Sequence, residues 1–285
     1  MTRLRSLLFA PGNRPEYFPK LVTSGADGIV LDLEDAVPPA AKRDAREEVR
    51  GALPSLLRQL GAARVFVRVN GPKTGWFQDD LEIVRSAGSG VVVPKLESLD
   101  ELGATGGWSA RVEVVAGIET VAAVEAAPAL CHAPVTAAYF GAEDLVADLG
   151  GRRTQAGLEV LYARTRVAFA ARLGGVRAID QVVIDLDDDV RFRREADEAR
   201  ALGYTGKLCI HPRQVALAND AFTPSAEELE MNQRLVEAFE RARREGRGVI
   251  DFDGRMVDQP VYQRAIAVLK AAEDGSGTSK ESGSL

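Results

Sequence analysis

The sequence has few of the residues that mark several common classes of protein. It holds two cysteines and two histidines among 285 residues. Cys131 and Cys209 follow no zinc or disulfide spacing, so we expect buried thiols in a protein of a reducing cytoplasm. The formal charge of −6 lacks the basic surplus of a nucleic-acid-binding protein. We expect no nucleic-acid partner.

Long apolar runs and a nucleotide fingerprint are also missing. No run approaches the roughly 18 residues of a membrane span, and the apolar stretch within residues 1–14 is too short for a signal peptide. We therefore expect no membrane partner. The segment PGNRPE after the first apolar run is not glycine-rich, which disfavours an open doubly wound sheet, the competing fold for the pattern described next.

Short apolar runs that end in polar or charged residues recur along the chain. They are LLFAPGNR, GIVLDLED, VFVRVN, GVVVPKLES, VEVVAGIET, AAYFGAED, QVVIDLDDD and KLCIHP. Amphipathic stretches typical of helices lie between them, as at 39–58 and 155–173. Strand–helix–strand repetition predicts parallel pairing with right-handed crossovers, and about 250 residues suffice for an eight-stranded barrel. We predict an α/β fold, a (β/α)₈ TIM barrel.

The pattern changes near the C-terminus. A long helix is expected over 225–245, because Ser225 and Glu228 have the spacing of a capping box. A segment rich in glycine and aspartate follows, and a last helix is expected over 260–272.

These features divide the chain. We assign residues 1–224 to the barrel and residues 225–272 to a C-terminal helical extension of the same domain, because the extension is too small for a good core of its own. We expect it to serve as a lid or oligomerisation arm. Residues 273–285 form a polar low-complexity tail that is expected to be disordered.

In a TIM barrel the C-terminal ends of all strands meet at one rim, where the active sites of this fold lie. The polar residues that follow the apolar runs are Arg14, Asp32, Glu34, Asp35, Arg68, Lys95, Glu119, Glu143, Asp144 and His211. The predicted fold brings them to the same rim.

Two of these carboxylates suggest a metal site. Glu119 and Asp144 end neighbouring apolar runs, one strand–helix–strand step apart, so their side chains can converge on one cation. Oxygen ligands without nearby histidine or cysteine favour Mg²⁺, or Mn²⁺, over Zn²⁺. The alternative is that each acidic residue caps the helix that follows its strand.

Two interpretations are open for each of three other residues. Arg68 either pairs with an acidic residue such as Glu34 or binds a substrate carboxylate or oxyanion. Lys95 is a candidate Schiff-base nucleophile, which a metal pair disfavours. His211 is a candidate acid or base, although a structural histidine beside a turn is the preferred interpretation.

The chain resembles a known family. The segments SLLFAPGNRPE, IVLDLEDAV, VRVN, VPKLES, IET, FGAEDL, CIHPRQ and MVDQP, within residues 3–270, are similar to those of the beta subunit of citrate lyase and its stand-alone relatives. These proteins belong to the metal-dependent aldolases that include malyl-CoA and citramalyl-CoA lyases. The resemblance implies a TIM barrel with a C-terminal extension, assembled as a homotrimer, hexamer or larger oligomer.

The resemblance also implies roles. Glu119 and Asp144 match the Mg²⁺ ligands, with Glu119 also near substrate, and Arg68 matches the substrate-binding arginine. Asp258 in MVDQP matches an aspartate that relatives deliver from the lid of a neighbouring subunit and that exchanges a proton with the acetyl carbon.

The activity implied is that of a lyase, a retro-Claisen cleavage of a citryl-, citramalyl- or malyl-CoA thioester to acetyl-CoA and a 2-oxo acid such as oxaloacetate. Arg14 and Lys95 are candidates for binding the CoA phosphates. Two alternatives stay open at this point. One is the catalytic beta subunit of a citrate lyase complex that acts on a citryl group on an acyl carrier protein, and the other is a non-catalytic barrel that serves as a scaffold or ligand sensor.

Overall fold

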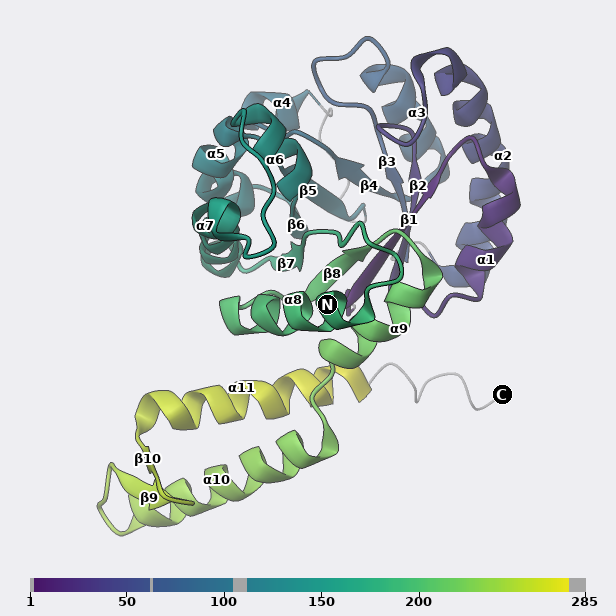
Figure 1. Ribbon diagram of the computed structural model, residues 1–285. Coiled ribbons are helices and arrows are strands. Elements are labelled where there is room, and N and C mark those ends of the chain that lie inside the picture. The colour runs from purple at the N-terminus through teal and green to yellow at the C-terminus, as the bar shows by residue number, and fades with distance from the viewer. Residues whose placement is uncertain (1–2, 62–63, 105–111, 277–285) are drawn as a thin grey trace, which may run out of the picture. The chain divides into compact units, whose positions relative to one another are not determined.

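The computed structural model describes residues 3–61, 64–104 and 112–276. Its contacts divide these residues into two compact units (Figure 1). One unit spans Leu4–Phe222, and the other contains Arg3 and the residues from Thr223 onward. The prediction that barrel and extension are one domain stays a prediction.

The first unit is a closed barrel of eight parallel strands, and the predicted fold is confirmed (Figure 1). The strands are β1 (Ser6–Pro11), β2 (Gly28–Asp32), β3 (Val65–Arg68), β4 (Gly90–Val93), β5 (Val114–Ile118), β6 (Ala137–Phe140), β7 (Arg177–Asp180) and β8 (Gly206–Cys209). Each strand pairs with the next in sequence, and β1 closes the barrel on β8 with Leu7 opposite Leu208.

Helices surround the barrel. They are α1 (Phe18–Val22), α2 (Lys42–Leu60), α3 (Phe77–Ala87), α4 (Leu99–Gly103), α5 (Val121–His132), α6 (Ala142–Asp148), α7 (Leu158–Gly174), α8 (Asp189–Leu202) and α9 (Pro212–Ala221), with 3₁₀ turns η1 (Pro15–Tyr17) and η2 (Pro39–Ala41). Their inner faces and the outward side chains of the strands form the larger apolar core.

A smaller apolar cluster fills the inside of the barrel and includes Val30, Phe66 and Tyr139. Successive side chains of a strand point to opposite faces. Asp32 lies two residues beyond Val30, and Arg68 lies two beyond Phe66, so both face inward at the C-terminal end of the barrel. The alternation of side chains along β2 and β3 therefore places Asp32 and Arg68 inside the barrel, at its C-terminal end.

The second unit contains a helix pair and a hairpin. It consists of α10 (Ala226–Arg244), β9 (Ile250–Phe252), β10 (Arg255–Val257) and α11 (Gln259–Ser276), and the antiparallel hairpin β9–β10 was not expected from the sequence. Phe239 stacks on Tyr262 with ring centroids 4.8 Å apart. The predicted N-cap is confirmed, because the Ser225 hydroxyl accepts from the backbone N–H of Glu228 at 3.1 Å.

Three expectations from composition can be compared with this fold. Helix α11 continues to Ser276, four residues into the expected tail, and the rest of that tail, 277–285, lies outside the described residues. Cys131 and Cys209 are buried free thiols, as predicted. Within the described residues, no helix is long and apolar enough to cross a membrane.

Candidate active site

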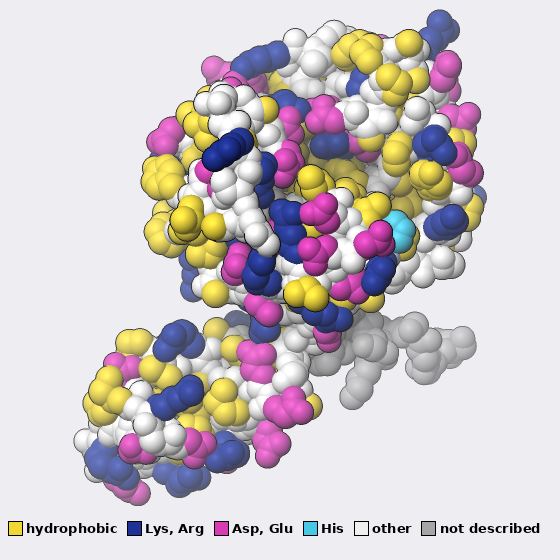
Figure 2. Space-filling view, in the orientation of Figure 1, with side chains coloured by type: hydrophobic (Ala, Val, Ile, Leu, Met, Phe, Trp, Pro, Cys, Tyr) yellow, Lys and Arg dark blue, Asp and Glu magenta, His cyan; other side chains and the backbone are white. Residues whose placement is uncertain are grey.

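A cavity of about 350 Å³ opens at the C-terminal end of the barrel. Its charged side chains are Asp32, Arg68, Glu119, Glu143 and Asp144, and its apolar wall includes Phe9, Val182, Ile184, Leu208 and Ile210. Figure 2 shows acidic and basic side chains gathered around a hollow in this face of the barrel. The cavity thus has a charged side and an apolar side.

Arg68 is held by two carboxylates from the end of β2. Its Nε and Nη2 donate to the two oxygens of Asp32 at 2.7 and 2.6 Å, and Nη1 lies 3.0 Å from Glu34. Burial raises the pKa of Asp32, but the opposing charge and hydrogen bonds of Arg68 keep it below its usual value. The fork of Arg68 is therefore fixed while the residue still lines the cavity.

Glu119 lies just beyond β5, almost wholly buried. Its Oε1 accepts from the backbone N–H of Lys95 at 2.8 Å, and its Oε2 accepts from the Tyr139 hydroxyl at 2.9 Å. Burial, together with the charges of Glu34 and Asp144, raises the pKa of Glu119 to about 7. The carboxylate is fixed in position but poorly compensated in charge.

Glycine makes room for this carboxylate. A Cβ on Gly141 would stand 2.5 Å from Oε2 of Glu119, and a Cβ on Gly117 would stand 2.5 Å from the Tyr139 hydroxyl. Real Cβ atoms do not approach other atoms so closely. Both glycines are therefore required by the present positions of Glu119 and Tyr139.

Asp144 does not lie on a strand end, which corrects the sequence-based expectation. Strand β6 ends at Phe140, and Asp144 lies in the first turn of α6. An acidic residue is favoured there by the helix dipole, as in the capping alternative. The residue nevertheless lines the cavity, and Lys95 Nζ lies 3.2 Å from its Oδ1.

Lys95 is enclosed by carboxylates rather than free to meet a phosphate. Its Nζ donates to Glu34 at 2.6 Å and lies 3.3 Å from Asp35, in addition to Asp144. Burial lowers the pKa of Lys95, but the hydrogen bond and charge of Glu34 outweigh it and raise the pKa above its usual value. A permanently protonated amine is not a nucleophile, so the Schiff-base alternative loses support.

The donor set of the site fits a hard divalent cation. Asp32, Glu34, Asp35, Glu119 and Asp144 carry five negative charges when ionised, whereas Arg68 and Lys95 supply two positive charges. One divalent cation would offset most of this excess negative charge. Across the described part of the chain, no group of three or more His, Cys, Asp or Glu residues is arranged to hold a metal. A cation at this site would therefore have two carboxylate ligands, Glu119 and Asp144. Water and substrate would fill its other coordination positions, which is common for Mg²⁺.

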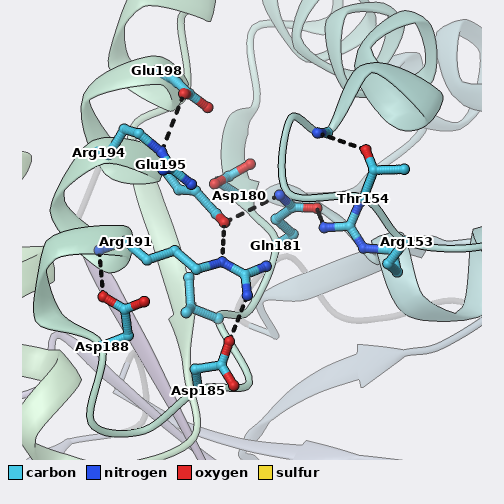
Figure 3. A network of polar contacts seen from close by, with 12 residues as sticks. Arg153, Thr154, Asp180, Gln181, Asp185, Asp188, Arg191, Arg194, Glu195 and Glu198 are labelled. Atoms are coloured by element: carbon cyan, nitrogen blue, oxygen red, sulfur yellow. Dashed lines mark hydrogen bonds and ion pairs between the residues drawn. The ribbon is translucent and has the colours of Figure 1, made fainter.

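A polar network supports the side of the cavity formed after β7 and near α6 (Figure 3). Arg153 donates to Glu143 at 2.9 Å and to Gln181 at 3.3 Å. Gln181 in turn donates to Glu195, which also accepts from Arg191 at 2.7 Å. Glu143, next to Asp144, and Gln181, next to Val182, are thereby linked to helix α8 through hydrogen bonds.

Deeper in the same region lies a buried ion cluster. Lys207 on β8 donates to Asp180 on β7 at 2.6 Å, and both are fully buried. Arg164 on α7 donates two further bonds to Asp180, at 2.8 and 2.9 Å. Since a buried charge is costly without a partner, this cluster joins β7, β8 and α7 firmly.

Arg14 and His211 lie outside the charged cavity. Arg14 is exposed, donates to Glu16 at 2.5 Å, and stands over the ring of Tyr17 at 5.1 Å. Tyr17, Lys20 and His211 line a second cavity of about 380 Å³, which shares Phe9, Ala10, Pro11 and Ile210 with the first. His211 Nδ1 accepts from the backbone N–H of Arg213 at 3.2 Å and so caps α9, which agrees with the structural interpretation.

Asp258 belongs to the second unit. It precedes α11, and its Oδ1 accepts from the backbone N–H of Val261 at 3.3 Å. Asp258 belongs with the helix pair and the hairpin, not with the barrel residues Leu4–Phe222. Its proposed catalytic role stays a prediction.

Sequence reasoning missed Tyr139 and Arg153. Tyr139 stands within the apolar run AAYF, and the only available signal was that a buried tyrosine hydroxyl needs a partner. Arg153 lies in an irregular segment between α6 and α7, where spacing carries no information about contacts.

Comparison with known proteins identifies the family. Residues 5–212 match the model of the HpcH/HpaI aldolase/citrate lyase family. The chain belongs to this family. The family resemblance and the expected enzyme class, a lyase, are confirmed.

Individual relatives agree over nearly the whole chain. The citrate lyase subunit beta-like protein of Deinococcus radiodurans is 47% identical over 273 residues, which cover 93% of this chain and 96% of that protein. Mitochondrial citramalyl-CoA lyase of Homo sapiens is 31% identical over 288 residues, covering 92% and 83%. A crystal structure of the protein CitE from Mycobacterium tuberculosis, in complex with magnesium, acetoacetate and coenzyme A, superposes with a TM-score of 0.81 at 34% identity, covering 94% and 97%.

Proposed function

We propose that this family member is a Mg²⁺-dependent carbon–carbon lyase that cleaves a 3-hydroxyacyl-CoA thioester of the citryl, citramalyl or malyl type. The products are acetyl-CoA and a 2-oxo acid: oxaloacetate, pyruvate or glyoxylate. The observation that carries the proposal is the convergence of Arg68, Glu119 and Asp144 at one cavity. Lys95 contacts Glu119 and Asp144 beside it, and the carboxylates of this cluster outnumber its cations. The magnesium and coenzyme A in the crystals of the M. tuberculosis relative support it.

Glu119 and Asp144 would hold the cation, and when bound it supplies Lewis-acid polarisation of the substrate oxygens. Arg68, fixed by Asp32 and Glu34, would offset the negative charge that develops on the substrate. The bond between the hydroxyl-bearing carbon and the acetyl carbon breaks, and its electron pair stays on the acetyl unit. Overall, one hydrogen moves from the hydroxyl group to the acetyl carbon.

Asp258 is the proposed partner in proton exchange with the acetyl carbon. The proposal rests on the family resemblance, in which this residue comes from the lid of a neighbouring subunit. It requires a homo-oligomer, expected to be a trimer or hexamer.

The surface of α7 supports self-association. Leu158, Tyr162, Phe169 and Leu173 are all more than 60% exposed. Their spacing of four, seven and four residues places them on one side of the helix, and apolar side chains gather over α7 in Figure 2. An exposed apolar stripe of this length is typical of a protein–protein contact.

The coenzyme would enter from the second cavity. It adjoins the charged cavity, and its margin presents the Tyr17 ring beside the cations of Arg14 and Lys20. An aromatic ring and cations suit an adenine and its phosphates. Arg14 is thus a better candidate for the CoA phosphates than Lys95, because exposed Arg14 pairs with one carboxylate, Glu16, whereas the Lys95 ammonium is surrounded by three.

The test is a direct assay. The purified protein is incubated with Mg²⁺ and each of citryl-, citramalyl- and malyl-CoA, and the released 2-oxo acid and acetyl-CoA are identified by mass spectrometry. One of the three thioesters should be cleaved, and neither Glu119→Gln nor Asp144→Asn protein should cleave it. Absence of any 2-oxo acid from all three would contradict the proposal.

A second candidate is the beta subunit of a citrate lyase complex. The name of the D. radiodurans relative favours it. The same assay with a citryl group on an acyl carrier protein separates the two, because a complex subunit should prefer that carrier over free CoA. A silent scaffold is disfavoured, since Asp32 and Glu119 are buried charges of a kind that an inert barrel has no reason to keep at its mouth.

A further inference from the structure

Lys95 has an unusual backbone conformation. Its φ of 48° lies in the left-handed region, which disfavours residues other than glycine and persists only when the surroundings impose it. With this φ, the backbone N–H donates to Glu119 while the side chain reaches Asp144 and Glu34. One residue therefore contacts both candidate metal ligands, through different groups.

The ammonium of Lys95 is surrounded by carboxylate oxygens. Lys95 Nζ lies 2.6 Å from Glu34, 3.2 Å from Asp144 and 3.3 Å from Asp35. Three oxygens from three carboxylates around one positive centre form a strongly attractive site. A divalent ion that binds Asp144 meets this ammonium as a competitor for the same carboxylate.

We infer that Lys95 is a built-in counter-ion, which holds Asp144 in place while the metal is absent and is displaced from it when Mg²⁺ binds. The inference rests on the proposed metal site and adds a positioning role for Lys95. After displacement the ammonium keeps Glu34 and Asp35 as partners, so it need not become unpaired. The lysine lowers the affinity for Mg²⁺ and protects the empty site from mutual repulsion of its carboxylates.

The experiment measures Mg²⁺ binding without substrate by isothermal titration calorimetry. Lys95→Met removes the charge but keeps the backbone N–H, so the protein should bind Mg²⁺ roughly tenfold more tightly than the unmodified chain. Its melting temperature should be lower than that of the unmodified chain in EDTA, and saturating Mg²⁺ should narrow this difference, because only the contact with Asp144 is replaced by the metal. Lys95→Arg, which keeps the charge, should bind within about threefold of the unmodified chain.

Lys73→Met is the matched control. Lys73 is an exposed lysine that also pairs with two carboxylates, Glu97 and Glu101, but contacts neither Glu119 nor Asp144 in the described contacts. Its loss should leave Mg²⁺ affinity unchanged. If Lys95→Met does not fold, Lys95→Gln, which is neutral but still donates hydrogen bonds, replaces it.

The outcomes separate this inference from the proposed function. Equal or weaker Mg²⁺ binding by a folded Lys95→Met protein, with binding by the unmodified chain intact, overturns the counter-ion role alone. Binding by Lys95→Met but not by the unmodified chain supports it. Binding by neither protein overturns both the counter-ion role and the metal site.

Discussion

The buried carboxyl group of Glu119 makes the stability of the metal-free protein depend on pH. Burial and the nearby charges of Glu34 and Asp144 raise its pKa from 4.5 to about 7. A raised pKa means that the folded protein prefers the protonated form. The folded state therefore carries no penalty from Glu119 below about pH 4.5, where the group is protonated in the folded and the unfolded protein. Stability is lost as the pH rises through about 7, because the buried carboxyl group must then ionise.

The size follows from the shift. A difference of about 2.5 pKa units, taken between 4.5 and about 7, corresponds to about 3 kcal/mol at about 1.4 kcal/mol per unit. Glu119→Gln resembles the protonated form at every pH. In EDTA it should therefore match the unmodified protein near about pH 4 and exceed it in free energy of unfolding by about 3 kcal/mol near about pH 8.

The assay is urea unfolding followed by circular dichroism, in EDTA, across this pH range for both proteins. Mg²⁺ added at about pH 8 should stabilise the unmodified protein and leave Glu119→Gln unchanged. Free energies of unfolding that change with pH in parallel in the two proteins would refute the argument. Ionisation of Glu119 would then not destabilise the folded state.

Four further substitutions test other parts of the structure. Asp144→Asn should fold normally but lose Mg²⁺ affinity by about tenfold or more in calorimetry, because a neutral amide holds a hard cation poorly; unchanged affinity would remove Asp144 from the ligands. Arg68→Lys should reduce kcat/KM by about 100-fold, since an ammonium cannot reproduce the two bonds to Asp32, and a variant with normal turnover and melting temperature would contradict this. Inactive Asp258→Asn protein mixed with inactive Asp144→Asn protein should regain activity once subunits exchange; mixed oligomers without activity would place Asp258 within its own site or outside catalysis. Asp180→Asn should lower the free energy of unfolding by about 3 kcal/mol or more, because Lys207 and Arg164 lose their buried partner, and a loss below about 1 kcal/mol in urea would argue against this role of the cluster.

The barrel and its rim could be predicted because the sequence signal is repeated. Each strand is a short apolar run, and parallel strands bring all their C-terminal ends together. Arg68 and Glu119 could therefore be assigned to one site before any contact was known. The pairing of Arg68 with Glu34, one of the two readings offered, is observed at 3.0 Å.

Other features gave no such signal. Helix α6 has only seven residues, too few for a periodic pattern, so Asp144 was assigned to a strand end. The left-handed φ of Lys95 cannot be predicted from a residue type that normally avoids it. From the sequence, Lys95 was a candidate Schiff-base nucleophile and a candidate for binding the CoA phosphates. The strands of the hairpin β9–β10 have three residues each, which is below the length at which alternation becomes visible.

The close approach of Gly141 to Glu119 has a consequence for how sequence variants of this protein are interpreted. Gly141 offers no functional group and has an ordinary negative φ of −107°, so neither chemistry nor backbone conformation marks it as sensitive. An alanine would nevertheless place a methyl group 2.5 Å from the carboxylate oxygen and push aside one of the two candidate metal ligands. In a mutational scan, Gly141→Ala should therefore reduce activity as strongly as substitutions of the charged residues of the cavity. It should be classified with the variants that disable the site, although glycine and alanine are chemically similar.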